Sequence, residues 1–99
     1  MRMLLKVQMD TAVSNEAVER GALQETMESV LRELRPEAAY FTPEDGCRTA
    51  YLFFDMADPS QIPRISEPLF RKLGARLHYS PVMNREDLAK GLAALDSDG

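Results

Sequence analysis

The sequence has very few of the residues that mark disulfide-stapled or metal-binding proteins. It contains one cysteine (Cys47), one histidine (His78) and no tryptophan. A single cysteine cannot form an internal disulfide, and one cysteine with one histidine is too small a set for a structural zinc site or a haem–thiolate site. We therefore expect no metal and no cofactor, and a location in the cytoplasm, where thiols stay reduced.

Long apolar runs and an excess of positive charge are also missing. The opening "MRMLLKVQMD" is interrupted by Lys6, Gln8 and Asp10, unlike a signal peptide, and no stretch has the length of a transmembrane span. The 12 basic and 16 acidic residues give a net charge of −4. This balance disfavours nucleic acid as a partner, because phosphate neutralisation requires a basic surface. No run of like charge indicates a membrane surface, and no glycine-rich phosphate loop is present.

What remains is the composition of an ordinary folded domain. The chain has 99 residues, of which 44% are hydrophobic, enough for one core. We expect a single domain over residues 1–95 and a frayed tail over 96–99.

Hydrophobic periodicity divides this domain into strands and helices. Alternating apolar and polar residues predict strands, and apolar residues three and four apart predict helices. The expected elements are a strand over 2–10, a helix capped at Ser14 or Asn15 and ending before Pro36, a strand over 38–42, a type I turn over 43–46 and a strand over 47–56. A helix capped by Asp58 follows and is ended by Gly74, and because of Pro63 and Pro68 we expect a kink or a short lead-in turn before its main part. A strand over 75–81 and a helix capped by Asn84 complete the domain.

The order of these elements predicts the fold class. The order β-α-β-β-α-β with an added C-terminal helix is the α+β, ferredoxin-like pattern. Right-handed crossovers place the first strand between the fourth and the third, with the second strand at an edge. We therefore expect a four-stranded antiparallel sheet with helices on one face.

Strand alternation assigns each residue of this sheet to a face. The face expected to meet the helices is wholly apolar or aromatic: Met3, Leu5, Val7, Met9, Ala39, Phe41, Ala50, Leu52, Phe54, Met56, Leu77 and Tyr79. The opposite face is polar but includes Leu4, Tyr40, Tyr51 and Phe53. Aromatic side chains among polar ones suggest a covered face, and no segment of the chain remains to cover it. We therefore expect a homodimer that pairs through this face.

Several stretches resemble the dimeric α/β-barrel superfamily of small ferredoxin-like proteins. They are "LLKVQM" at residues 4–9, "YLFFDM" at 51–56 and "EPLFRKLGARLHYSPVM" at 67–83. Muconolactone isomerases of that superfamily have a comparable first strand and an aromatic-rich third strand ending in an aspartate, here Asp55. The ending "PVMN-EDL" most resembles an uncharacterised group of short bacterial proteins. The resemblance implies a two-sheet barrel with a central cavity, and it transfers no catalytic residue, because this fold carries many functions.

His78 is the candidate catalytic residue, on the polar face beside Lys6. A base next to an oxyanion stabiliser could abstract a proton adjacent to a carbonyl, with His78 as the base and Lys6 or Tyr51 as the stabiliser. His78 could instead make a hydrogen bond within the dimer or lie half exposed, and these are the more frequent roles of such a residue.

The other candidate residues line the same face. They are Lys6, Gln8, Tyr40, Tyr51, Phe53 and Arg76. The aromatic members could stack on a planar ligand or pack in a dimer, since aromatics are enriched at interfaces. Lys6 could also form an ordinary ion pair with Asp10 or Asp55.

Three functions stay open on this basis. The first is the binding of a small aromatic or carbonyl-bearing molecule in a cavity between the two sheets. The second is an isomerase or cyclase in which His78 is the general base, and the third is a non-catalytic structural or interaction module. The sequence leaves open whether the protein is an enzyme.

Overall fold

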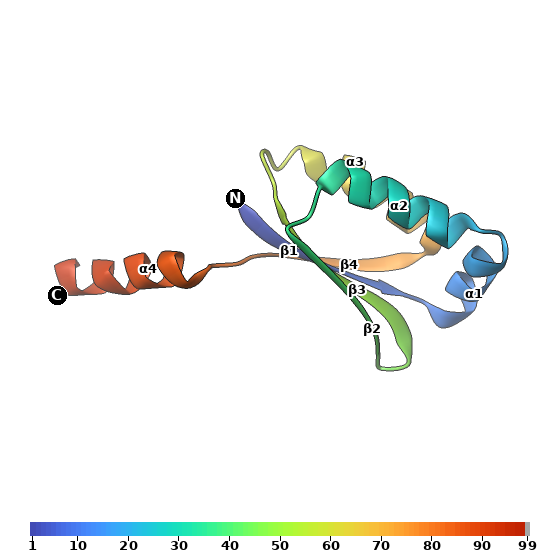
Figure 1. Cartoon of the computed structure of the whole chain (residues 1–99), viewed down its shortest axis with the longest axis horizontal. Coiled ribbons are helices and arrows are strands. Elements are labelled where there is room, and N and C mark those ends of the chain that lie inside the picture. The colour runs from blue at the N-terminus through green and yellow to red at the C-terminus, as the bar shows by residue number, and fades with distance from the viewer. Residues whose placement is uncertain (99) are drawn as a thin grey trace.

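A computed structural model describes the backbone of residues 1–98 and the side chains of residues 1–95. The elements in chain order are β1 (Arg2–Met9), α1 (Thr11–Glu19), α2 (Ala22–Leu34), β2 (Ala38–Glu44), β3 (Cys47–Asp55), α3 (Gln61–Leu73), β4 (Ala75–Pro81) and α4 (Arg85–Asp98) (Figure 1). Of the tail expected over 96–99, Gly99 and the side chains of 96–98 lie outside the described residues, so fraying there stays a prediction.

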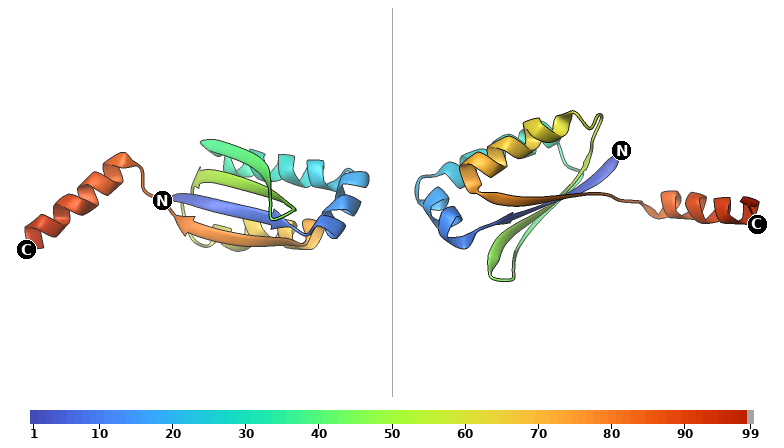
Figure 2. Two further views of the ribbon diagram at one scale, coloured as in Figure 1. Left: turned by 90° about the horizontal axis from the view of Figure 1, so that it is seen from below. Right: turned by 180° about the vertical axis from the view of Figure 1, so that it is seen from behind.

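The four strands form one open antiparallel sheet in the order β2-β3-β1-β4. This is the predicted order, with the first strand between the fourth and the third and the second strand at an edge. Helices α1, α2 and α3 lie on one side of the sheet (Figures 1 and 2). The predicted α+β class is therefore confirmed. The other side of the sheet, which we call the open face, carries none of the helices in residues 1–98.

The core lies between the sheet and the three helices. Burial alternates strictly along β1, with Met3, Leu5, Val7 and Met9 buried and the residues between them half-buried. Strand register places these side chains beside the apolar residues of β3 and β4, as the alternation predicted. One member of the predicted helix-facing set is not covered: Phe41 is 55% exposed, because the β2–β3 hairpin extends past the helices (Figure 1).

The first helical region differs from the prediction, because it contains two helices. Gly21 takes a left-handed conformation (φ 73°), which a chain of L-residues cannot continue as a helix, and it separates α1 from α2. The N-cap of α1 is Asp10, whose carboxylate accepts from the Val13 amide at 3.0 Å. Ser14 and Asn15, predicted as caps, instead accept hydrogen bonds from the Arg48 guanidinium at 2.7 and 2.9 Å, joining α1 to β3.

The predicted type I turn over 43–46 is also wrong. Asp45 (φ 53°) and Gly46 (φ 75°) both have positive φ, and Glu44 pairs directly with Cys47. Two central residues of positive φ define a type I′ hairpin, whose twist matches that of the strands. Pro43 and Glu44 therefore belong to β2 and not to the turn, and β2 tolerates Pro43 because it is an edge strand.

The second half of the chain follows the prediction more closely. The predicted cap Asp58 lies in a short turn before α3, where its carboxylate accepts from the Ser60 amide at 2.8 Å. The N-cap of α3 is Ser60 and not Asp58, and the helix begins at Gln61. The helix continues through Pro68 and ends at Gly74 in the left-handed conformation. Asn84 caps α4 reciprocally: its side chain accepts from the Asp87 amide at 2.8 Å, and the Asp87 carboxylate accepts from the Asn84 amide at 3.0 Å.

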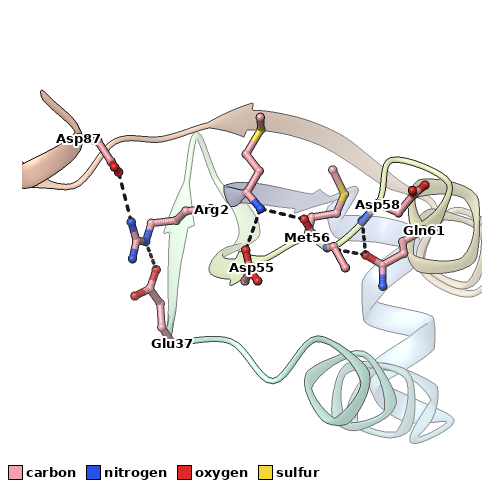
Figure 3. Close-up of polar contacts among 9 residues, drawn as sticks. Arg2, Glu37, Asp55, Met56, Asp58, Gln61 and Asp87 are labelled. Carbon is pink, nitrogen blue, oxygen red and sulfur yellow. Dashed lines mark hydrogen bonds and ion pairs between the residues drawn. The ribbon is translucent and has the colours of Figure 1, made fainter. Parts of the chain in front are cut away.

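Helix α4 projects from the end of the sheet, away from the other helices (Figures 1 and 2). Its base is held by Arg2, which bonds to Glu37 at 2.7 Å and to Asp87 at 3.4 Å (Figure 3). Within the described chain, α4 packs against no other helix or strand to any substantial extent. No described helix is long and apolar enough to cross a membrane.

Candidate functional site

One row of side chains crosses the open face from edge to edge. The register pairs Tyr40 with Tyr51, Tyr51 with Lys6, and Lys6 with His78, so β2, β3, β1 and β4 each contribute one residue. Directly paired residues of an antiparallel sheet project from the same face, with Cβ atoms about 5 Å apart. We call these four residues the central row, and it brings together four of the seven residues predicted from the sequence.

The other three predicted residues lie in the neighbouring rows. Gln8 is paired with Arg76 on β4 and with Thr49 on β3, next to the central row. Phe53 lies on the other side of the central row and is paired with Leu4 and Ala38. All seven predicted residues therefore share the open face.

Glu44 is part of this site, although sequence reasoning placed it in a turn. Its carboxylate accepts hydrogen bonds from the Lys6 ammonium and the Tyr51 hydroxyl. Its backbone carbonyl accepts from the Gln8 side-chain amide at 3.2 Å. The Asp45-Gly46 dipeptide, a strong signal for a two-residue hairpin, was the clue that would have extended β2 to Glu44.

These contacts make Glu44 the centre of a small polar network. The Lys6 ammonium nitrogen also lies 5.8 Å from the centroid of the Tyr51 ring, at the outer range of a cation–π contact. Lys6 and Glu44 are 32% and 30% exposed. The pair is thus partly shielded from water, and it holds Lys6 and Tyr51 in position. It also compensates the charge of Lys6, so the predicted pairing of Lys6 with Asp10 or Asp55 does not occur.

An open hollow lies beside the network, between β1 and β4. It is lined by Lys6, Gln8, Arg76, Leu77 and His78. Arg76 and His78 are exposed, and neither makes a side-chain hydrogen bond or ion pair within residues 1–95. The hollow therefore presents free hydrogen-bonding groups of net positive charge to solvent. In the described residues, no three carboxylate, thiol or imidazole groups are placed to hold a metal ion.

A second cluster of charges lies at the base of α4, apart from the hollow. The Met1 amino group bonds to the Asp55 carboxylate at 2.8 Å and to the Met56 carbonyl at 3.0 Å (Figure 3). The hydrogen bond and charge of this amino group lower the pKa of Asp55 below its ordinary value. Asp55, the aspartate of the muconolactone isomerase resemblance, therefore belongs to an exposed structural ion pair, away from His78.

The Lys6–Glu44 contact predicts a measurable coupling. We expect Glu44→Gln to lower the free energy of unfolding by about 1 kcal/mol, between the values typical of exposed and buried ion pairs. In a double-mutant cycle with Lys6→Met, chemical denaturation should give a coupling energy of roughly 0.5–1 kcal/mol. Glu67→Gln is the matched control, because Glu67 forms an exposed i,i+4 pair with Arg71. Equal effects of the two glutamate variants would contradict a shielded network.

Comparison with known proteins adds no assignment. No protein-family model matches the chain, no curated protein matches it, and no solved structure matches it.

Proposed function

We propose that two copies of the chain pair through their open faces, as in a ferredoxin-like dimeric α/β barrel, and bind a small carboxylate-bearing molecule with a planar aromatic or carbonyl group between them. The observation that carries the proposal is the hollow beside the central row. It combines two cations, an amide and an imidazole on one wall with tyrosine rings nearby.

The charges of the hollow favour an anionic ligand. Glu44 compensates Lys6, whereas Arg76 has no acidic partner within residues 1–95. A guanidinium presents two parallel N–H donors that match a carboxylate, and such charge-assisted pairs are stronger than neutral ones. His78 lines the same hollow as Arg76 and offers a further polar contact to a ligand held by that guanidinium.

The aromatic residues favour a planar ligand. Tyr40 is 65% exposed and Tyr51 is half-buried next to it, so the Tyr40 ring offers a free surface at the edge of the central row. Exposed aromatic rings with polar groups nearby are typical of sites that combine an apolar lining with a few orienting contacts. A second sheet over this face would exclude water and strengthen each polar contact.

Thermal unfolding with a ligand panel tests this proposal. We expect benzoate, hydroxybenzoates and phenylpyruvate to raise the melting temperature, and the matched amide benzamide to have no effect. A ligand at 100 times its Kd adds about 2.7 kcal/mol to stability, which for a chain of this size is a shift on the order of 10 °C.

The variant Arg76→Gln should weaken binding of the active acid by at least about tenfold, since it removes a charge-assisted pair of about 1.5–3 kcal/mol. Lys72→Gln is the control, because Lys72 is an exposed cation at the end of α3, on the other side of the sheet. A panel without any shift, or acid and amide shifts of equal size, would argue against the proposal.

The isomerase or cyclase reaction is a second candidate, favoured by the position of His78 directly opposite Lys6. His78 would take a proton next to the ligand carbonyl, and Lys6 would stabilise the resulting oxyanion. For a bound acid that carries hydrogen on the carbon next to its carbonyl, such as phenylpyruvate, exchange of that hydrogen with deuterated solvent measures this step. Loss of exchange in His78→Gln with binding retained supports catalysis, and unchanged exchange removes His78 as the base.

A further inference from the structure

The projecting helix α4 carries apolar side chains that no other described element of the chain covers. Leu88, Leu92 and Leu95 are 46%, 54% and 66% exposed, and their spacing of four and three residues places them along one side of the helix. We call these three residues the α4 stripe. A helix of 14 residues without tertiary packing is only marginally stable in water, because tertiary contacts supply most helix stability. The α4 stripe therefore requires a partner surface.

The dimensions of the chain indicate how much surface is left uncovered. Its accessible area is 6829 Å², roughly 1,100 Å² more than a monomer of 11.2 kDa usually exposes. Its radius of gyration is 16.1 Å, against about 13 Å for a compact domain of this length. The excess area is on the order of what one subunit contributes to a standard dimer interface, about 800 Å². The uncovered area is therefore large enough for a second copy of the same chain to bury in an interface of standard size.

The open face offers α4 a complementary surface. The row next to the base of α4 is apolar, with Leu4 paired to Phe53, and both are half-buried. Beyond it lies the hollow, where Arg76 supplies positive charge that no acidic residue among residues 1–95 compensates. The first turn of α4 carries Glu86 and Asp87. The Asp87 carboxylate already bonds to Arg2 and to the Asn84 amide, so Glu86 is the acidic side chain that faces the basic hollow when α4 of one copy lies over the sheet of the other.

We propose that α4 is an arm that crosses to a second copy of the chain and packs over that copy's open face, so that each hollow is closed by the partner's helix. The proposal deepens the proposed function and rests on the dimer suggested there. The arm goes beyond the proposed function because it makes the ligand site incomplete in a single chain and assigns α4 of the partner as the cover of that site.

The reach of α4 fits this arrangement. The helix leaves the sheet beside the start of β1 and points away from it (Figure 1). When two open faces meet with antiparallel central strands about an axis near Leu4, the partner's Lys6 and the partner's Gln8 lie about 7 and 13 Å from that axis, on the side to which α4 points. Val82 bonds to Arg2 about 7 Å from the axis, so residues 82–84 and the first turn of α4 reach this region, and the helix, about 21 Å long, continues beyond it.

Sedimentation velocity and hydrogen exchange of the full chain test the proposal. We expect a dimer at about 50 µM. The double variant Leu88→Glu/Leu92→Glu should dissociate at least about tenfold more readily. The matched control Ala93→Glu/Ala94→Glu adds the same charges to the same helix away from the α4 stripe, and it should remain dimeric. Amide protection of α4 should fall on dilution, together with the loss of dimer.

Other outcomes overturn the arm and separate it from the proposed function. If the wild-type chain is a dimer and the variant Leu88→Glu/Leu92→Glu dimerises equally well, α4 is not part of the interface. The dimer through the open faces would still be supported. A monomer whose α4 amides are protected at every concentration would mean that α4 folds back on its own sheet. If the dissociation and hydrogen-exchange results support the arm but no acid raises the melting temperature, the proposed ligand is rejected and the dimer is retained.

Discussion

Replacing Phe54 by alanine should destabilise the fold by about 3–5 kcal/mol, the usual range for a buried phenylalanine. Phe54 is 2% exposed and lies on β3, paired with Met3 of the central strand, at the centre of the contact between sheet and helices. A domain of about 100 residues is stable by only about 5–15 kcal/mol, so this one change removes a large part of the total. Urea unfolding at several protein concentrations measures the loss and separates it from dimer dissociation.

Phe70→Ala is the control for the same deletion in a different place. Phe70 is 45% exposed on α3, where alanine is also the better helix former. We expect a cost of about 1 kcal/mol or less, because roughly half of the ring already contacts water. Similar costs for the two variants would mean that the core is not centred on Phe54.

Gly74→Ala should cost roughly 2–3 kcal/mol, from two separate causes. Gly74 ends α3 with φ 58°, a left-handed conformation that costs a residue with a Cβ about 1 kcal/mol. A Cβ at this position would also lie 3.1 Å from Cγ1 of Val13, closer than ordinary packing allows. The β-branched Val13 side chain has few other rotamers, so α1 must shift to make room. Thermal or urea unfolding measures the total.

Gly21 serves as the control for the first cause, the left-handed backbone conformation. It has φ 73°, and a Cβ built on it meets nothing within 4 Å. Gly21→Ala should therefore cost only about 1 kcal/mol. Adding Val13→Ala to Gly74→Ala should recover most of the difference. An equal cost at both glycines would show that Val13 yields without strain.

The period-two alternation of β1 was sufficient to predict which side chains enter the core and which share the open face. It succeeded because shifting a strand by one residue would expose every apolar side chain, so the register has one favourable solution. The break at Gly21 was missed because the apolar spacing of the helix continues on both sides of it. The Glu44 network was missed for a related reason, since one wrong turn type moved the residue out of the sheet.

The sequence analysis also did not predict that α4 projects away from the sheet, and the reason is different. Its leucine spacing predicts an apolar side of the helix, but the same spacing fits a helix packed on its own sheet or on a neighbour. The start of α4 is joined to the sheet by a contact between residues far apart in sequence, the hydrogen bond between Arg2 and Asp87. Such a contact depends on the whole fold, and local pattern carries no information about it.

The strand order also affects how the chain folds during synthesis. β1 is made first but lies in the middle of the sheet, between β3 and β4, so its partners emerge from the ribosome after about 40 and 70 further residues. Until then its four apolar side chains and both backbone edges are open to other chains. Pairing over such separations is slow, because loop closure must precede it. Expression temperature and chaperone supply should therefore affect the soluble yield of this protein more than that of a helical bundle of equal length.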